Sequence, residues 1–208
     1  LDRTTDEKYK ELCDKYGVFL IADEVAVGFG RTGTMFACEQ ADITPDFLCL
    51  SKGITAGYLP LSVVLFSNDT YNAFYCDYNE GKSFLDSHSY TGNTLACAVA
   101  NATLDIFEKK NVIEKNKEKI KYMKFLVEKF KDLDCVGEVR QTGMVCAIEF
   151  KGFNPEQRIG LQVFQKALKK GVYIRPLGHV IYFMPPYIFT RKNLRKMINT
   201  TYDVVKAL

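Results

Sequence analysis

Two side chains of this sequence, Asp23 and Lys52, have the types and positions that carbonyl chemistry requires. Each follows a largely apolar run, at residues 18–22 and 46–51, which is typical of a buried parallel strand with a polar carboxyl end. Partial burial lowers the pKa of a lysine amine and frees its lone pair to capture an aldehyde. A strand-end carboxylate can keep a heteroaromatic nitrogen protonated by pairing with its cation. Pyridoxal phosphate needs that combination of lysine and carboxylate.

The same pair also fits a simpler interpretation. The carboxyl ends of parallel strands share one edge of a sheet, so we expect Asp23 and Lys52 to face a common ligand there. Charged residues at strand ends are common, however. Composition alone therefore favours an ordinary ion pair or two solvent-facing side chains.

A glycine pattern follows the first of these strands. Gly28, Gly30 and Gly33 spell G-x-G-x-x-G, which formally matches the dinucleotide-binding fingerprint. In that fingerprint the glycines leave the strand directly and open a long helix whose N-terminus faces a pyrophosphate. Here Asp23 and Glu24 intervene and would repel a diphosphate, and no long helical pattern follows Gly33. We favour a turn, and a dinucleotide-binding module is the alternative from another functional class.

The elements that must position these residues alternate between helix and strand. Apolar and capping patterns predict helices at residues 9–17, 93–110, 112–131, 154–171 and 190–205. Short apolar runs predict strands at residues 18–22, 46–51, 61–66, 136–140, 144–150, 172–175 and 180–184. This alternation predicts an α/β fold with a parallel-rich sheet flanked by helices. The shorter strands of the second half predict a smaller α+β domain, so we expect domains at 1–110 and 111–208.

The charge of the chain is balanced. Among its 208 residues, 28 Lys and Arg against 25 Asp and Glu give a formal net charge of +3. We take this charge as evenly spread, which predicts no phosphate-backbone binding and no nucleic-acid partner. The lysines of residues 115–124 alternate with glutamates and are expected to form a solvated face.

Composition also bears on metals, disulfides and location. The seven cysteines are odd in number and form no C-x-x-C, which indicates reduced thiols. Two histidines are too few for a His-rich metal site, so we expect no metal. No apolar run approaches a membrane span and no signal peptide opens the sequence, so we expect a cytoplasmic protein without a membrane partner.

A longer, ordered set of motifs surrounds the Asp23–Lys52 pair. Residues 20–33 read LIADEVAVGFGRTG, Pro45-Asp46 follows, and Ser51-Lys52-Gly53 comes later. Lys52 is thus 29 positions after Asp23. This set resembles the signature of the class III, fold-type-I pyridoxal-phosphate aminotransferases. The resemblance implies that Lys52 binds the cofactor aldehyde, that Asp23 pairs with its pyridinium, and that the protein is a homodimer with a shared active site.

A later segment, residues 87–93 with the sequence SHSYTGN, adds to this resemblance. It is similar to the family segment in which a Ser or Thr of the neighbouring subunit bonds the cofactor phosphate. The resemblance implies a cofactor-binding role for Ser89, with His88 and Tyr90 beside it.

Residues 36–39, 59–62, 174–178 and 181–187 resemble one branch of the family, which acts in biotin biosynthesis. That branch transfers an amino group from S-adenosylmethionine to 8-amino-7-oxononanoate and gives 7,8-diaminononanoate. The resemblance implies that Arg175 grips the substrate carboxylate, with Gly178 in the same turn and Tyr182 beside the substrate. An arginine suits this task because its guanidinium makes two parallel charged hydrogen bonds. The amino donor stays open between S-adenosylmethionine and lysine, and an ornithine-like or omega-amino acid aminotransferase is the alternative within the family.

The resemblance covers nearly all of this chain but only the carboxyl-terminal portion of the family. The absent portion would supply the glycine-serine loop that holds the cofactor phosphate and the aromatic side chain stacked on its ring. We therefore expect an incomplete part of the enzyme that is inactive alone. An inactive structural fragment is the third alternative.

Overall fold

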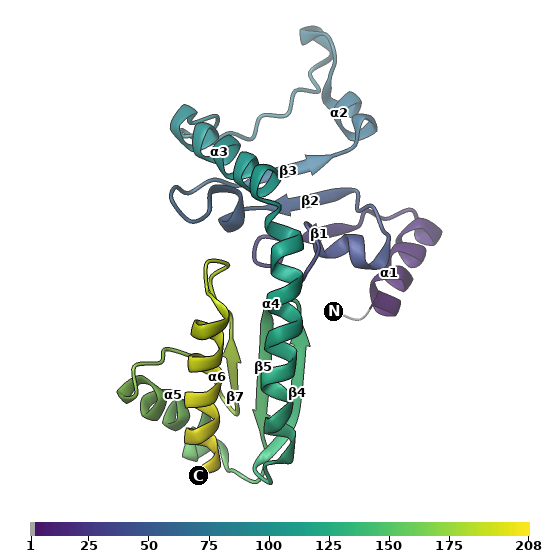
Figure 1. Cartoon of the computed structure of the whole chain (residues 1–208). Helices are drawn as coiled ribbons and strands as arrows, with labels where there is room; N and C mark the ends of the chain where they lie inside the picture. Colours follow the sequence, from purple (N-terminus) through teal and green to yellow (C-terminus); the bar gives the residue numbers. More distant parts are fainter. Residues whose placement is uncertain (1–2) are drawn as a thin grey trace. The chain divides into compact units, whose positions relative to one another are not determined.

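The computed structural model describes residues 3–208 and divides into two compact units (Figure 1). Unit 1 holds the chain as far as Gly30 together with Thr34–Asn111, and unit 2 holds Arg31–Gly33 together with Val112–Leu208. The chain therefore leaves unit 1 after Gly30, contributes three residues to unit 2 and returns. Within residues 3–208 we find no helix with the length and apolar character that crossing a bilayer requires.

Unit 1 combines helices with one small sheet. Its elements are α1 (Arg3–Tyr16), β1 (Ile21–Asp23), the 3-10 helix η1 (Ala37–Ala41), β2 (Phe47–Leu50), η2 (Lys52–Thr55), β3 (Val63–Phe66), α2 (Asn68–Phe74), η3 (Tyr78–Glu80) and α3 (Thr94–Lys110). The sheet has the order β1-β2-β3, in which β1 and β2 are parallel and β3 is antiparallel to β2. The predicted helices before Gly17 and after Asn93 are confirmed.

Local signals explain where these two helices end and begin. Gly17 follows α1 at φ +62°, a left-handed conformation that glycine adopts without strain. Asn93 begins α3, because its side-chain oxygen accepts the backbone N–H of Ala96 at 3.1 Å. The buried apolar cluster of this unit is small and contains Phe29, Leu50, Ile54 and Ala100.

Two expectations for the first sheet are wrong. The run at residues 61–66 forms an antiparallel strand, because a 3-10 turn rather than a crossover helix connects β2 to β3. The first strand is shorter than expected and is not buried on both faces: Ile21 and Asp23 are exposed, since β1 lies at the sheet edge and pairs with β2 alone. The sheet of this chain therefore has one parallel and one antiparallel pair instead of a parallel-rich arrangement.

Unit 2 is a four-stranded antiparallel sheet with helices. Its elements from Val112 onward are α4 (Val112–Val127), η4 (Glu128–Asp132), β4 (Val136–Thr142), β5 (Val145–Phe150), η5 (Pro155–Gln157), α5 (Ile159–Lys169), β6 (Arg175–Leu177), β7 (Val180–Phe183) and α6 (Arg191–Lys206). The strand order is β4-β5-β7-β6. Figure 1 shows α4 and α6 running along the sheet, and α6 packs against both α4 and α5.

The core of unit 2 is much larger than that of unit 1. It contains buried side chains from α4, η4, α5 and α6 and from strands β4, β5 and β7, among them Met123, Ile148, Val163, Ile181 and Leu194. α6 presents an apolar stripe to this core and begins at a capping box, in which Thr190 Oγ1 accepts the N–H of Asn193 at 3.2 Å. The predicted last helix is confirmed.

Two boundaries in unit 2 differ from the expected ones. The helix expected from Asn154 forms only the single turn η5, because Arg158 adopts a left-handed conformation at φ +47° and α5 begins at Ile159. The strand expected at residues 172–175 begins at Arg175 instead. Val172 and Ile174 are buried in the core without being part of a strand, so their apolar alternation reflects burial in the connection after α5.

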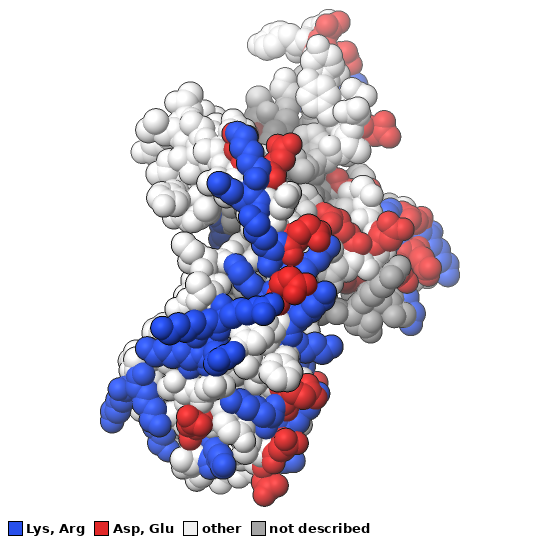
Figure 2. All heavy atoms as spheres, in the orientation of Figure 1, with Lys and Arg blue, Asp and Glu red and all other residues white. Residues whose placement is uncertain are grey.

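Charge is not evenly spread, contrary to the expectation from the sequence. Residues 112–208 hold 19 of the 28 Lys and Arg but 9 of the 25 Asp and Glu, so the second half of the chain is strongly basic. Figure 2 shows Lys and Arg gathered over part of unit 2. The exposed basic residues of α5 and α6 include Lys166, Lys169, Arg191, Lys192, Arg195, Lys196 and Lys206. An even distribution of charge can therefore no longer be used to argue against a nucleic-acid partner.

Candidate active site

Asp23 and Lys52 lie at the same edge of the first sheet. Asp23 ends β1 and is the parallel partner of Cys49 on β2, and Lys52 comes three positions after Cys49. Both side chains are exposed at the carboxyl ends of the two parallel strands. The expectation that these ends share one edge is confirmed, because β1 and β2 are parallel neighbours.

Lys52 lies in a turn with an unusual backbone. Its φ is +43°, in the left-handed region that non-glycine residues seldom adopt. The turn is closed by Ser51 Oγ, which donates to the carbonyl of Leu61 at 2.7 Å, and by the N–H of Gly57, which donates to the carbonyl of Lys52 at 3.3 Å. Lys52 lines a cavity of about 260 Å³ together with the loop that follows it. Lys52 therefore borders space that a ligand could occupy.

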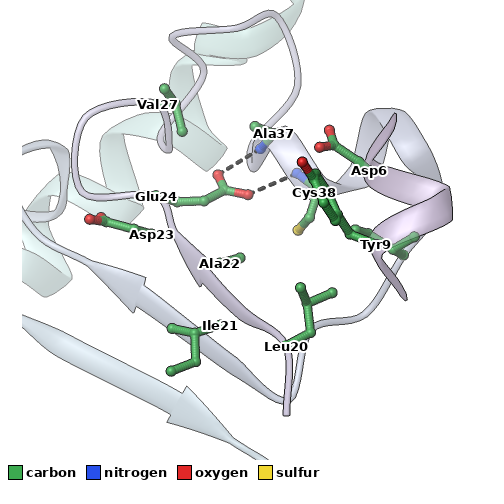
Figure 3. Close-up of a pocket in the computed structure, with 11 residues that line it drawn as sticks. Asp6, Tyr9, Leu20, Ile21, Ala22, Asp23, Glu24, Val27, Ala37 and Cys38 are labelled. Carbon is green, nitrogen blue, oxygen red and sulfur yellow. Dashed lines mark hydrogen bonds between the residues drawn. The ribbon is translucent and has the colours of Figure 1, made fainter. Parts of the chain in front are cut away.

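Asp23 and its neighbour Glu24 point to opposite sides of the end of β1 (Figure 3). Glu24 is buried, and its carboxylate accepts the backbone N–H groups of Ala37 at 2.6 Å and Cys38 at 2.8 Å. Asp23 is exposed, and its carboxylate accepts the N–H of Val25 at 3.1 Å. Asp23 is thus the carboxylate available to a ligand, while Glu24 ties η1 to the strand.

The cavity in Figure 3, of about 200 Å³, lies between α1, β1 and η1 and is lined mainly by apolar side chains. The Cys38 thiol borders it. Burial and a hydrogen bond with Glu24 raise the pKa of this thiol to about 12, so it stays protonated near neutral pH. The thiol is therefore unreactive. Asp23 also lines this cavity, whereas Lys52 lines the other one.

The glycine pattern does not form a phosphate site. The long helix that the dinucleotide fingerprint requires is replaced after Gly33 by the short η1. The first N–H groups of η1 already donate to the Glu24 carboxylate. A diphosphate there would meet a buried negative charge instead of free N–H groups, which argues against the dinucleotide alternative.

Ser89, His88 and Tyr90 form an exposed turn before α3. The N–H of Tyr90 donates to His88 Nδ1 at 3.1 Å, and the N–H of His88 donates to Thr91 Oγ1 at 3.0 Å. The two rings of His88 and Tyr90 lie 5.6 Å apart. The turn therefore presents the Ser89 side chain to the exterior of unit 1.

Arg175 and Tyr182 are cross-strand neighbours in unit 2, paired directly between β6 and β7. Hydrogen bonding with Tyr182, and secondarily with Tyr173, raises the pKa of the exposed Arg175 guanidinium. Gly178 supplies the turn between the two strands at φ +58°. Its carbonyl accepts the N–H of Gly160 at 3.3 Å. The structure thus brings all three expected substrate residues into one hairpin of unit 2.

Arg31 is a residue to which the sequence analysis gives no role. Its guanidinium donates to the carbonyl of Pro185 at 2.9 Å and lies 4.6 Å from the centre of the Tyr187 ring. The N–H of Met144 donates to the carbonyl of Arg31 at 2.9 Å. Arg31 therefore attaches its three-residue segment to unit 2. An arginine inside a glycine pattern was the only available signal, since its partner lies 154 positions away.

The residues of unit 1 fit pyridoxal phosphate. An exposed amine that borders a cavity and an exposed carboxylate on the neighbouring parallel strand match the two groups that the cofactor requires. The amine can bind the aldehyde and the carboxylate can pair with a protonated ring nitrogen.

Comparisons with known proteins point to the same chemistry. The family profile described as Aminotransferase class-III matches residues 4–205. Adenosylmethionine-8-amino-7-oxononanoate aminotransferase of Helicobacter pylori is 51% identical over 201 residues, which cover 95% of this chain and 46% of that protein. The protein of the same name from Aquifex aeolicus is 45% identical over 206 residues, covering 96% of this chain and 46% of that protein. The crystal structure of the protein of that name from Methanocaldococcus jannaschii superposes with a TM-score of 0.91 at 40% identity, covering 97% of this chain and 48% of that one. The chain thus spans about half the length of the relatives it matches.

Proposed function

The chain belongs to the class-III aminotransferase family, and from this premise we propose that it is part of an enzyme of biotin biosynthesis. The proposed enzyme transfers an amino group from S-adenosylmethionine to 8-amino-7-oxononanoate and yields 7,8-diaminononanoate. The observation that carries the proposal is the parallel pairing of β1 with β2, which brings Asp23 and Lys52 to one sheet edge. The names of the similar proteins support the substrates.

Unit 1 holds the chemical groups of this proposal. Pyridoxal phosphate, when bound, supplies an electron sink for the reacting carbon. Asp23 keeps the ring nitrogen protonated by pairing with its positive charge. The Lys52 amine binds the aldehyde and, once displaced by the donor amine, moves a proton at the substrate carbon. Ser89, with His88 and Tyr90, binds the phosphate in a second copy of the chain, which makes the enzyme a homodimer.

Unit 2 supplies substrate recognition. Arg175 binds the carboxylate of 8-amino-7-oxononanoate, whose charge lies at the far end from the reacting ketone. Tyr182 orients the guanidinium, and Gly178 allows the turn that presents it. We assign unit 1 to the large cofactor-binding domain and unit 2 to the small carboxyl-terminal domain of a cytoplasmic enzyme. Lysine stays the alternative amino donor.

Borohydride reduction of the full-length enzyme loaded with pyridoxal phosphate tests the proposal. Reduction fixes the cofactor on the lysine that binds it, and peptide mass mapping identifies that lysine. We expect the adduct on Lys52 and no adduct in Lys52→Ala. Lys82, an exposed lysine of the same unit, serves as the internal control for non-specific labelling. An adduct on any lysine other than Lys52 would contradict the proposed role.

A further inference from the structure

Six non-glycine residues of the described chain have positive φ, and four of them have an ordinary explanation. Those four end helices or 3-10 turns as left-handed caps: Asp42, Ala56, Asn111 and Arg158. The other two, Phe29 at φ +55° and Lys52 at φ +43°, end no helix. Backbone strain without a local reason is found where the surrounding structure imposes it, often at functional sites.

These two strained residues meet at Gly53. A Cβ atom added to Gly53 would lie 2.7, 2.8 and 2.9 Å from three atoms of the Phe29 side chain. These are the nearest atoms to that position, so the Phe29 ring occupies the space that a side chain at position 53 would need. Gly53 itself is not in the left-handed region. Position 53 therefore requires glycine because the Phe29 side chain lies so close, and not because of the φ angle of residue 53.

Core packing and backbone hydrogen bonds of the neighbouring glycines fix the position of Phe29. It is buried in the core of unit 1, and its ring packs against those of Phe36 at 5.8 Å and Phe107 at 6.1 Å between centres. The N–H of Gly28 donates to the carbonyl of Glu24 at 2.9 Å, and the N–H of Gly30 donates to the carbonyl of Met35 at 3.2 Å. The glycine pattern that resembles a nucleotide fingerprint thus presents a fixed aromatic ring.

We propose that Phe29 is a positioning residue for Lys52, acting through Gly53. The Phe29 ring packs against Gly53 in the turn that carries the lysine. The hydrogen bonds within the turn hold its backbone. This inference rests on the proposed function in one respect, that Lys52 is the lysine that binds the cofactor. The mechanical part, that Phe29 holds the turn, stands on the contact itself.

A double-mutant cycle in the full-length enzyme tests the proposal. Phe29→Ala removes Cγ and Cδ2, two of the three atoms nearest the Cβ position of Gly53, and Gly53→Ala adds a Cβ that collides with the Phe29 side chain. The double variant Phe29→Ala/Gly53→Ala combines the truncated side chain with the added Cβ. Each single variant is expected to impair the turn, and the double variant is expected to recover part of the loss, because the two residues share one contact.

Two measurements on the cofactor-free enzyme report the effect. Hydrogen exchange follows the amides of Ile54, Ala56 and Gly57, whose bonds close the turn. The rise of visible absorbance after addition of pyridoxal phosphate gives the rate at which the lysine captures it. In each single variant we expect exchange to be faster and capture slower by about fivefold, within the coupling range of residues in contact.

Phe36→Ala is the matched control. It removes the same atoms from a ring that packs on Phe29 beside the same core, so it reports loss of core packing alone. Equal effects of Phe36→Ala and Phe29→Ala would overturn the proposal, as would strict additivity in the cycle. Faster exchange with unchanged capture would show that Phe29 holds the turn without positioning the lysine. A borohydride adduct on another lysine would instead defeat the proposed function and leave the exchange result interpretable.

Discussion

Arg175 is the residue whose environment bears most directly on substrate choice. Its guanidinium lies beside the phenols of Tyr182 and Tyr173 on an exposed hairpin, which orients its planar donors without neutralising its charge. The acceptor 8-amino-7-oxononanoate carries its carboxylate far from the reacting ketone, whereas S-adenosylmethionine carries one next to its reacting amine. With the proposed role of Arg175, the two half-reactions are expected to depend on it to different extents.

Replacement of Arg175 by alanine in the full-length enzyme is expected to raise the KM of the acceptor half-reaction by about tenfold or more, because a bidentate charged contact is lost. The donor half-reaction is expected to change less. Arg175→Lys keeps the charge without the fork and should recover part of the loss. Single-turnover measurements of each half-reaction provide the numbers.

Arg140→Ala is a suitable control, since Arg140 is an exposed arginine of the same sheet that pairs with Glu138 and Glu149. Equal losses in both half-reactions of Arg175→Ala would assign Arg175 a structural role. The substrate proposal would then revert to an unspecified class-III aminotransferase.

At the scale of single residues, the sequence predicted the exposed groups that we propose bind the cofactor better than the groups that we propose position them. Asp23 and Lys52 could be found because each ends an apolar run, and parallel strands bring such ends together. Phe29 could not be found, because its importance lies in a contact with Gly53 and a backbone angle that composition does not encode. Glu24 was taken as a repulsive charge, whereas it is a buried acceptor for η1.

At the scale of elements, the packing of α5 on the hairpin of β6 and β7 determines how Arg175 is presented. Gly160, in the first turn of α5, lies against the hairpin backbone: an added Cβ would be 2.6 Å from the carbonyl oxygen of Gly178 and 3.0 Å from that of Val180. A backbone carbonyl cannot move aside as a flexible side chain can. The helix and the turn must therefore separate if position 160 gains a side chain.

Gly160→Ala is expected to lower the free energy of unfolding by about 1–3 kcal/mol, the usual cost of overpacking. It is also expected to speed exchange of the amides around Gly178. Urea denaturation and hydrogen exchange measure the two effects. Gly137→Ala is the matched control, because its Cβ would make only ordinary contacts of 3.5 Å or more. Similar unfolding energies for the two variants would show that α5 shifts freely and that this contact does not constrain the hairpin.

Element boundaries were predictable where a capping residue marked them. Thr190 and Asn93 each accept a backbone N–H in the first turn of the helix they precede, as their types suggest. The expected helix start at Asn154 was wrong because the same capping residues precede 3-10 turns and α-helices. Here Arg158 ends the 3-10 turn η5, and α5 begins only at Ile159. The direction of β3 was also not encoded in its apolar run, since it depends on the connection from β2.

At the scale of the whole molecule, the two units differ in how well they are enclosed. The buried apolar cluster of unit 1 contains four residues, whereas the core of unit 2 draws on α4, α5, α6 and its sheet. Strands β1 and β3 leave large apolar side chains exposed, with Ile21 at 62% and Phe66 at 49%. In the proposed full-length homodimer, we expect further chain or the second copy to cover this apolar surface.

For the 208-residue chain studied alone, we expect amides of β5 and β7 to exchange at least about 100-fold more slowly than those of β1 and β3, because local stability follows burial. The chain should also bind a hydrophobic dye. In the full-length enzyme the difference in exchange should shrink and dye binding should fall. Equal protection of both sheets in the isolated chain would show that unit 1 needs no further covering.

The sequence did not predict how strand lengths and charge are distributed. The strands of unit 1 have three or four residues and β4 has seven, so the expected shortening in the second half is wrong. What changes is the sheet type, from a mixed to an antiparallel sheet. The net charge of +3 did not reveal the basic second half, because the excess of acidic residues in the first half offsets it in the sum. The insertion of Arg31–Gly33 into unit 2 follows from long-range contacts that no local pattern signals.

The left-handed backbone of Lys52 has a consequence for the evolution and engineering of this chain. A lysine at φ +43° costs about 1–3 kcal/mol of stability that glycine would not, since glycine has no Cβ to strain. A library selected for thermal resistance alone would thus be enriched in glycine or asparagine at position 52, and its best-folded members would have lost the amine. A library selected for activity as well as for thermal resistance is expected to keep lysine at position 52 in spite of this cost.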